Sequence, residues 1–232
     1  MSHHRSVHEG GYLCGENTRR EIIEAALAQF ALHGFEGASI RGISKAAGVK
    51  SPAVHYYFRT KEGLYTACMN TIIERIWDEL GDRVCTAEAL LAQQNTHDDF
   101  LIEAYLEILS GLNVFSYDTS SLKNWQRFMA REQTGLGPEP AFDLMQKGFY
   151  LRLIRLTRSI VGRLTGHSVD DETTIIRTLA FNCQSMLLGG AGPLHAMSKY
   201  DVGTLQRILS EQNRATLRAL VQLRNSAHAD GG

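Results

Sequence analysis

The sequence predicts an all-α protein with a small N-terminal helix-turn-helix domain followed by a larger helical domain. Apolar residues recur at helical spacing through most of the 232 residues, and no segment alternates between apolar and polar residues as a strand would. The connections between these stretches are short and polar or rich in glycine and proline. We therefore expect two domains, residues 17–62 and 63–226, with flexible tails at 1–16 and 227–232.

The first helix is predicted to begin at Thr18 and to end at Gly34. Thr18 and Glu21 have the spacing of a capping box, in which each side chain bonds the backbone N–H of the other residue. Apolar residues follow at helical spacing from Ile22 to Phe30. Glycine is the commonest residue just after a helix, because it adopts the left-handed conformation without strain.

Two short helices follow and together make a helix-turn-helix. Ser39 can cap the second helix, whose buried side includes Ile43, before Gly48 breaks it. Ser51 can cap the third helix and Pro52 can take its first position, where the missing N–H of proline costs nothing. The turn between the two helices has three or four residues and contains glycine, as helix-turn-helix motifs do.

The third helix is predicted to have one packed face and one face that carries rings. Val54 and Phe58 are four residues apart and can share the inward face. The opposite side has helical spacing and consists of Pro52, His55, Tyr56 and Arg59. Tyr57 falls between the two faces and can either pack or contact a ligand. Such a helix fits the major groove of DNA, where histidine and tyrosine can bond phosphates or base edges.

The charge distribution favours the same kind of ligand. The chain has a formal net charge of −1, but residues 39–62 hold five basic residues against Glu62 alone. This local excess indicates a polyanion site, the alternative being a solvated charge cluster. Lys61 falls in the first turn of the next helix, where the macrodipole disfavours a cation, so we expect an anion nearby. The capped start at Ser39 can also bind phosphate, and Arg41 can reach a guanine edge.

The remaining chain is predicted to be a series of longer helices. The first runs from Thr60 to about Leu80, ends at Gly81 and links the two domains. Six more helices are expected, near residues 86–95, 98–115, 121–133, 140–165, 171–189 and 202–225. The apolar residues of the helix at 171–189 cover more than one stripe, which indicates burial on two sides and favours a dimer.

Composition excludes several other classes of protein. The four cysteines are far apart and form no CxxC pair, which is typical of buried free thiols in a reducing cytoplasm. No stretch of about 18 residues is apolar and uncharged, and the first sixteen residues lack the apolar core of a secretion signal. We therefore expect a cytoplasmic protein that does not enter a membrane and needs no metal or cofactor.

An enzyme is not expected. His97 and His167 each have acidic neighbours, but both groups fall at predicted helix starts, where acids act as caps. The group at His97 lacks the i, i+4 spacing of a helical metal site. The motifs GxSxG, HExxH and GxxxxGK are absent from the sequence.

The segment GASIRGISKAAGVKSPAVHYYFRTKEGLYTA resembles the DNA-binding signature of the tetracycline-repressor-type (TetR) family of transcriptional regulators, over roughly Thr18 to Ile76. The residues that this resemblance places at DNA are Arg41, Ser51, Pro52, Ala53, His55, Tyr56, Tyr57 and Lys61. The helix start and the basic excess add Ser39 and Lys50. His55 replaces the tyrosine that is usual in the family, so the main phosphate contact falls to His55 or to Tyr56.

The segment FMAREQTGLGPEPAFDLM and the amphipathic helix after it are similar to the C-terminal domain of the CecR (CerR-like) subgroup. This resemblance implies a homodimer, whose last two helices pair with their mates, and a cavity for a small-molecule effector. Candidate cavity residues are the apolar Trp125, Phe128, Met129, Phe149, Phe181 and Met186, and the polar Glu132, Asn182 and Gln184. Each of them can equally belong to the core, and Asn182 can instead bond across the dimer seam.

Together these features predict a ligand-responsive transcriptional regulator, a repressor that a small hydrophobic or drug-like effector releases from a palindromic operator in double-stranded DNA. A recognition helix near one end of each subunit requires two copies, since half-sites one DNA turn apart reflect a two-fold axis. The alternative is a DNA-binding structural or protein-interaction factor on the same dimer, without an effector.

Overall fold

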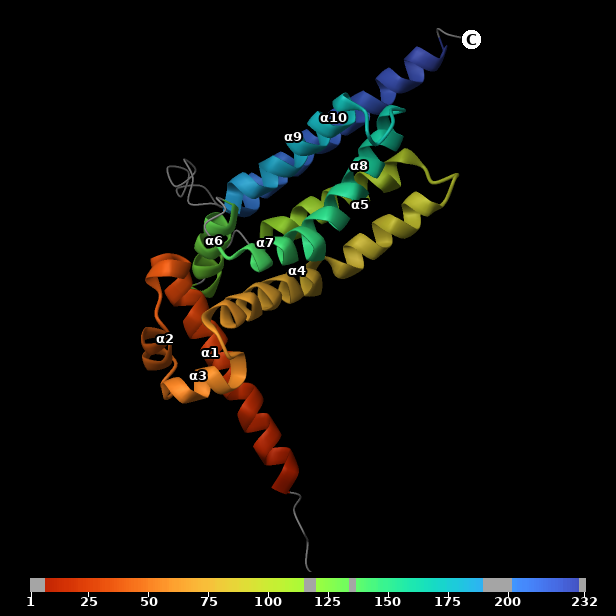
Figure 1. Ribbon diagram of the computed structural model, residues 1–232. Helices are drawn as coiled ribbons and strands as arrows, with labels where there is room; N and C mark the ends of the chain where they lie inside the picture. Colours follow the sequence, from red (N-terminus) through yellow and green to blue (C-terminus); the bar gives the residue numbers. More distant parts are fainter. Residues whose placement is uncertain (1–6, 115–119, 134–136, 190–201, 230–232) are drawn as a thin grey trace, which may run out of the picture. The chain divides into compact units, whose positions relative to one another are not determined.

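The computed structural model describes residues 7–114, 120–133, 137–189 and 202–229, and these ranges contain helices and turns but no strand. The all-α prediction is confirmed. The chain divides into two units, the first formed by Met1–Ile72 with Lys123–Leu144 and the second by Ile73–Leu122 with Met145–Gly232. Figure 1 labels the helices of both units.

The first unit begins with α1 (Val7–Gly37), α2 (Ile40–Ala46) and α3 (Ser51–Phe58), followed by the start of α4 (Lys61–Ala92). It also contains most of α6 (Ser120–Gln133) and most of α7 (Glu139–Met145). The helices at the N-terminus are therefore joined by two elements from the middle of the chain.

The helix α1 differs from its prediction at the start and agrees with it at the end. It begins at Val7, so residues 7–16, expected to belong to a flexible tail, are helical; no proline interrupts them. Gly34 has φ 73° and ψ 178°, a conformation that breaks the regular helix at the predicted residue.

The core of the first unit is formed by the predicted apolar stripe of α1 together with aromatic rings. Ile22, Leu27 and Phe30 are buried. The ring of Phe30 lies 4.8 Å from that of Tyr65 on α4, which lies 4.6 Å from that of Phe128 on α6 (centroid distances). These rings hold three helices together, since aromatic pairs at this distance add to the burial of their area.

Two predicted helix boundaries are wrong. Ser51 does not cap α3, because the N-cap is Lys50 and Ser51 is already helical; the N–H of Ala53 closes the first turn on the Lys50 carbonyl at 2.9 Å. The helix α4 does not end at Gly81 but continues to Ala92, so the helix expected at 86–95 is largely its last part. Leu80, Val84 and Ala87 are all buried along this extension, and their burial favours continuing the helix.

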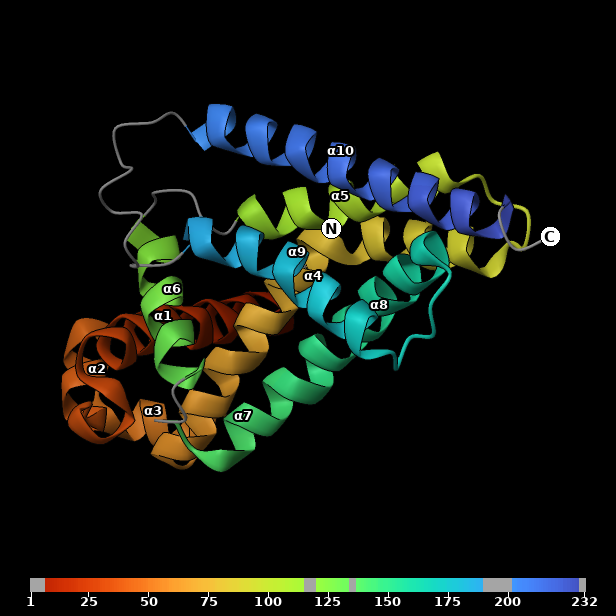
Figure 2. The ribbon, with the colours of Figure 1, turned by 90° about the horizontal axis from the view of Figure 1, so that it is seen from above.

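The second unit contains the rest of α4, α5 (Asp98–Val114), a π-helical turn (Gln146–Tyr150), α8 (Leu151–Thr165), α9 (Glu172–Gly189) and α10 (Val202–Ala229). The helix expected at 140–165 is thus interrupted by the π turn. The helix α10 lies along α5, as Figure 2 shows. Three arginines of α10 pair with acids of α5, in the pairs Arg214–Glu103, Arg218–Asp99 and Arg224–Asp98.

The cysteines only partly follow their prediction. Cys68 is buried, and burial raises the pKa of its thiol. Cys85 and Cys183 are exposed, because they fall on the outer sides of their helices. The side chain of Cys14 lies outside the described side chains.

Candidate nucleic-acid interface

The helix-turn-helix forms where the sequence predicts it. Ser39 is the N-cap of α2, and its hydroxyl accepts a hydrogen bond from the Gly42 N–H at 3.0 Å. Gly48 has φ 68° in the turn between α2 and α3, a conformation that favours glycine. The cap and the turn together determine the direction in which α3 leaves α2.

The two faces of α3 are as expected. Val54 and Phe58 are buried, whereas Pro52, His55 and Tyr56 are exposed. Tyr56 has 82% of its surface accessible, a large value for an aromatic residue in an ordered helix. The face that carries the rings is therefore free to meet a ligand.

The end of α3 limits how His55 can act. Its Nδ1 lies 3.1 Å from the carbonyl oxygen of Arg59, so a proton on Nδ1 would be donated to that carbonyl. Arg59 has φ 59°, and its N–H donates to the His55 carbonyl at 3.0 Å. With Nδ1 engaged in this way, Nε2 is the ring nitrogen left to face a ligand.

Tyr57 occupies the intermediate position that the sequence left open. It is half-buried, and its ring meets that of Tyr56 edge-on at 5.1 Å and that of Phe58 at 6.1 Å. A half-buried ring in this position is compatible with packing and with a ligand contact.

Lys61 is held in place by the end of α1. Its Nζ donates to the Glu36 carbonyl at 3.3 Å and lies 4.6 Å from the centroid of the Phe35 ring. A carbonyl oxygen and a ring face are both electron-rich, so they offset the unfavourable position at the start of α4. Thr60 caps this start by accepting from the Gly63 N–H at 3.0 Å.

The predicted DNA contacts are thus collected on α2, α3 and the start of α4. The exposed members are Ser39, Arg41, Lys50, Pro52, His55 and Tyr56, and the half-buried ones are Ser51, Ala53, Tyr57 and Lys61. None of the ten is buried. The arrangement offers cations, hydroxyls and backbone N–H groups to a polyanion.

The contacts of α6 within the first unit were not predicted. Nε of Arg131 donates to the Ala31 carbonyl at 3.2 Å, and Nη2 donates to the Leu32 carbonyl at 3.1 Å. Both carbonyls lie in the last turn before the break at Gly34, where helical carbonyls lack partners. A side chain about 100 positions away therefore caps α1, and no local sequence signal reveals it.

Glu132 lies beside Arg131 and is buried. Its Oε1 accepts a short hydrogen bond from the Tyr65 hydroxyl. Burial raises the pKa of the Glu132 carboxyl, while the bond from Tyr65 acts in the opposite direction. Among the described residues no donor reaches Oε2.

The candidate effector residues fall into both units. Trp125, Phe128, Met129 and Glu132 belong to the first unit, and Phe149, Phe181 and Asn182 belong to the second. The side chain of Met186 lies outside the described side chains.

The second unit holds a chain of polar groups at its core. The Tyr105 hydroxyl donates to Oδ1 of Asn182 at 2.9 Å, and Nδ2 of Asn182 donates to Oγ1 of Thr157 at 3.2 Å. Phe181 meets the ring of Tyr105 edge-on at 6.0 Å. Tyr105 and Thr157 were not predicted, because only their position opposite Asn182 distinguishes them from ordinary core residues. Phe149 packs separately against Trp77, at 5.8 Å between ring centroids.

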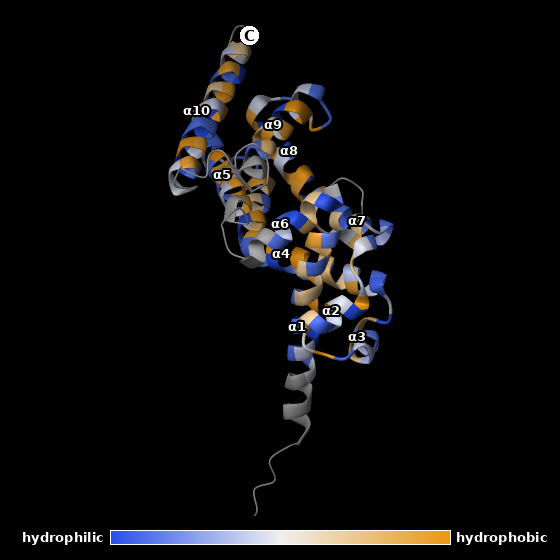
Figure 3. Cartoon of the chain, turned by 90° about the vertical axis from the view of Figure 1, so that its left-hand side faces the viewer, coloured by the Kyte–Doolittle hydropathy of each residue, from blue (hydrophilic) through white to orange (hydrophobic). Residues whose placement is uncertain are grey.

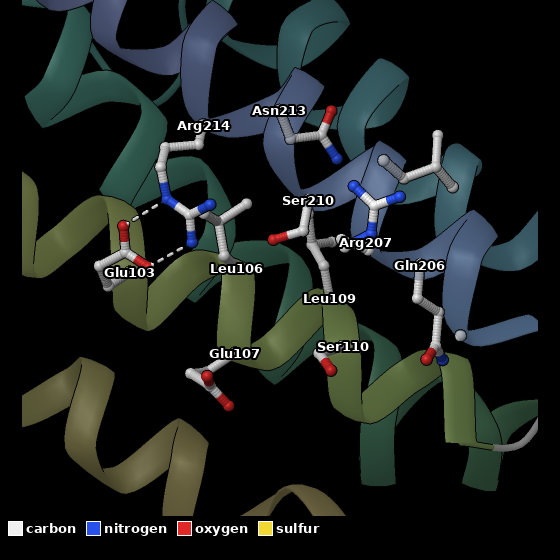
Figure 4. A pocket seen from close by; sticks show the side chains of 12 residues that line it. Glu103, Leu106, Glu107, Leu109, Ser110, Gln206, Arg207, Ser210, Asn213 and Arg214 are labelled. Carbon is white, nitrogen blue, oxygen red and sulfur yellow. Dashed lines mark hydrogen bonds and ion pairs between the residues drawn. The ribbon is translucent and has the colours of Figure 1, made fainter.

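A cavity of about 260 Å³ lies between α5 and α10 (Figure 4). Its polar side chains include Glu103 and Arg214, which form a two-pronged ion pair at 2.6 and 2.7 Å. None of the expected effector residues lines it.

Membrane spans and metal clusters are both absent from the described part of the chain. No helix within the described ranges is long and apolar enough to cross a membrane. No group of three or more His, Cys, Asp or Glu side chains among the described residues is arranged to hold a metal ion.

Comparison with known proteins agrees with the geometry of the helix-turn-helix. Residues 22–68 match the family model for bacterial regulatory proteins of the tetR family, and residues 101–220 match that for the C-terminal domain of the HTH-type transcriptional dual regulator CecR. The CecR regulator of Shigella flexneri is 30% identical over 166 residues, which cover 72% of this chain and 73% of that protein.

Two solved structures are similar in fold. The complex of AibR with isovaleryl coenzyme A and operator DNA has a TM-score of 0.61 at 14% identity, covering 84% of this chain and 97% of that one. A complex of SmeT with triclosan has a TM-score of 0.57 at 16% identity, covering 86% of this chain and 91% of that one.

Proposed function

Because the chain belongs to the TetR family of bacterial regulatory proteins and has a CecR-type C-terminal domain, we propose that it is a cytoplasmic repressor released from its operator by a small molecule. The family consists of DNA-binding transcriptional regulators and not of enzymes. The finer parts of the proposal are the palindromic operator, the homodimer and the release by an effector.

The exposed ring face of α3 is the observation that carries the DNA-binding mode. Tyr56 and His55 project from a helix whose other side is packed, so α3 can enter a major groove without unfolding. Lys61 and the capped start of α2 can hold phosphates on either side of it. Backbone contacts would set the register, and a few side chains of α3 would read the bases.

Exposed apolar side chains on the last two helices support a homodimer. Ile176 and Leu179 on α9 and Ile208 and Leu223 on α10 are each 47–66% exposed in the single chain. Hydrophobic and hydrophilic residues alternate along α10 (Figure 3). Large apolar residues gathered on two helices favour a second copy of the chain as the covering surface.

The polar chain through Asn182 is our candidate for the effector site. Tyr105, Asn182 and Thr157 come from three helices of the second unit and converge among apolar residues, as the few polar groups of a ligand site do. A hydrophobic or drug-like molecule could replace one of these hydrogen bonds with a bond to its own polar group. Such a molecule shifts the protein away from DNA only if it binds the released state more tightly.

The coupling between effector and DNA would run through α4 and α6. The helix α4 contributes residues to both units, and Arg131 and Glu132 of α6 bond to α1 and to Tyr65 of α4. A shift of α6 would therefore change the support of the helix-turn-helix.

Binding to an operator fragment, measured by fluorescence anisotropy, tests the DNA-binding mode. The fragment is first selected from the DNA next to the gene. Tyr56→Ala and Lys61→Ala are each expected to weaken binding about tenfold or more, in line with the loss of one or two charge-assisted or stacking contacts. Phe100→Ala, which removes an exposed ring on α5, is the matched control and should bind normally.

Full affinity in both variants would overturn the assignment. His55→Gln and Tyr56→Phe then separate the two candidates for the main phosphate contact. A thermal-shift screen of hydrophobic compounds tests the effector, since a ligand of the native state raises its melting temperature. If no compound does so, the effector-independent alternative is favoured.

A further inference from the structure

We propose that a groove between α4 and α8 binds an anionic amphiphile, a small molecule with an apolar chain and a carboxylate or phosphate headgroup. The groove lies within the second unit and has a volume of about 460 Å³, within the range of small-molecule sites. It shares no residue with the polar chain through Asn182 or with the cavity between α5 and α10. This site is therefore independent of the proposed effector site.

The charges of the groove favour an anion. Lys147, Arg152 and Arg155 line it, and Glu88 is the acidic residue among its lining residues. The lining thus carries an excess of two positive charges, and Lys147 and Arg155 are exposed to solvent. Hydrogen bonds from such cations to a carboxylate or phosphate are about twice as strong as neutral ones.

The apolar residues of the groove can bind the alkyl chain of the ligand. Leu151 lies four positions from both Lys147 and Arg155 along the helical segment, and half of its surface is exposed. Leu91 of α4 is half-buried on the opposite wall. Two leucines beside cations bind an alkyl chain and its charged end together, whereas an inorganic anion would use the cations alone.

Arg152 already holds an anion that belongs to the protein. Its guanidinium donates from Nε to Oε1 of Glu88 at 3.0 Å and from Nη2 to Oε2 at 2.8 Å. The same guanidinium lies 4.9 Å from the centroid of the Trp77 ring. The Glu88 carboxylate therefore occupies the place of a headgroup, and it competes with an incoming anion for Arg152.

The π turn next to the groove helps to fix the positions of Lys147 and Arg152 relative to one another. The indole N–H of Trp77 donates to the Gly148 carbonyl at 2.8 Å, within the turn Gln146–Tyr150. π turns inside helices occur frequently at functional sites. Trp77 thereby connects the turn that carries Lys147 to the guanidinium of Arg152.

Isothermal titration calorimetry with decanoate and with decyl phosphate, each below its micellar range, tests the proposal on the full chain. Binding of either is expected, and the tighter of the two identifies the headgroup. Inorganic phosphate should bind at least about tenfold more weakly, because it lacks the chain. The cation decyltrimethylammonium, which has the chain but the opposite charge, should not bind measurably.

Two variants are expected to change the affinity in opposite directions. Arg155→Gln removes a cation and should weaken binding by about tenfold, the usual effect of one charge-assisted hydrogen bond. Glu88→Gln releases Arg152 and should strengthen binding several-fold. Arg158→Gln, on the same helix but outside the lining, is the matched control and should leave affinity unchanged.

Equal binding of the cationic amphiphile, or unchanged affinity in both Arg155→Gln and Glu88→Gln, would overturn the proposal. The circular dichroism spectrum of each variant confirms that it is folded. No step uses DNA, so a failure of operator binding leaves the result of this experiment intact.

Discussion

Replacing Tyr65 by phenylalanine should destabilise the first unit by about 2–3 kcal/mol at neutral pH. The ring packing against Phe30 and Phe128 is kept, and only the hydroxyl that donates to the buried Glu132 is lost. A hydrogen bond to a charged group contributes roughly 1.5–3 kcal/mol, and the loss of this one leaves Glu132 without a donor among the described residues.

The destabilisation caused by Tyr65→Phe should be smaller at acid pH. Burial raises the pKa of Glu132 in the folded state above its unfolded value, so the ionised carboxylate lowers stability as the pH rises through that interval. The hydrogen bond from Tyr65 partly offsets this increase in the pKa of Glu132. Tyr65→Phe removes that bond and should therefore raise the folded-state pKa of Glu132 further. Below the unfolded pKa the carboxyl is protonated in both states, and the variant loses only a neutral hydrogen bond of about 0.5–1.5 kcal/mol.

Urea unfolding followed by far-UV circular dichroism, at neutral and at acid pH, measures both effects. The destabilisation caused by Tyr65→Phe is measured in the wild-type background and in the Glu132→Leu background. In the second background the acceptor is absent, and the destabilisation should fall below about 0.5 kcal/mol. Tyr56→Phe removes the hydroxyl of an exposed ring and should stay within about 0.5 kcal/mol of the wild type. Equal costs of Tyr65→Phe in both backgrounds would refute the coupling of Tyr65 to Glu132.

Three further predictions concern helix ends and ion pairs. Ser39→Ala should lower the free energy of unfolding by about 1 kcal/mol through loss of the α2 cap, whereas Ser51→Ala should be nearly neutral in the same measurement. Gly81→Ala should stabilise the chain by about 0.5–1 kcal/mol in thermal unfolding, because a Cβ there meets no other atom within 4 Å. Arg214 holds the pKa of Glu103 below its usual value, so the pair stabilises the fold at pH values above the unfolded pKa of Glu103. This stabilisation is lost as the pH falls through the folded pKa. Arg214→Gln should therefore flatten the acid side of a plot of unfolding free energy against pH.

The sequence was most informative where a structure depends on residues a few positions apart. The cap at Ser39, the turn at Gly48 and the buried pair Val54 and Phe58 follow from local spacing, and the structure confirms each of them. The contacts of Arg131 and Glu132 could not be found in this way. Their partners on α1 and α4 are far away in sequence, and only folding brings the three helices together.

The wrong boundary at Gly81 shows that a glycine does not always end a helix. Gly34 and Gly48 end their helices with positive φ, whereas Gly81 does not have a positive φ and lies inside α4. The residues after each glycine account for the difference. After Gly81 the buried stripe continues through Val84 and Ala87, and its burial outweighs the roughly 1 kcal/mol by which glycine disfavours a helix. Glycine therefore marks the end of a helix only where the apolar period ends with it, and that period has to be traced beyond the glycine before a boundary is placed.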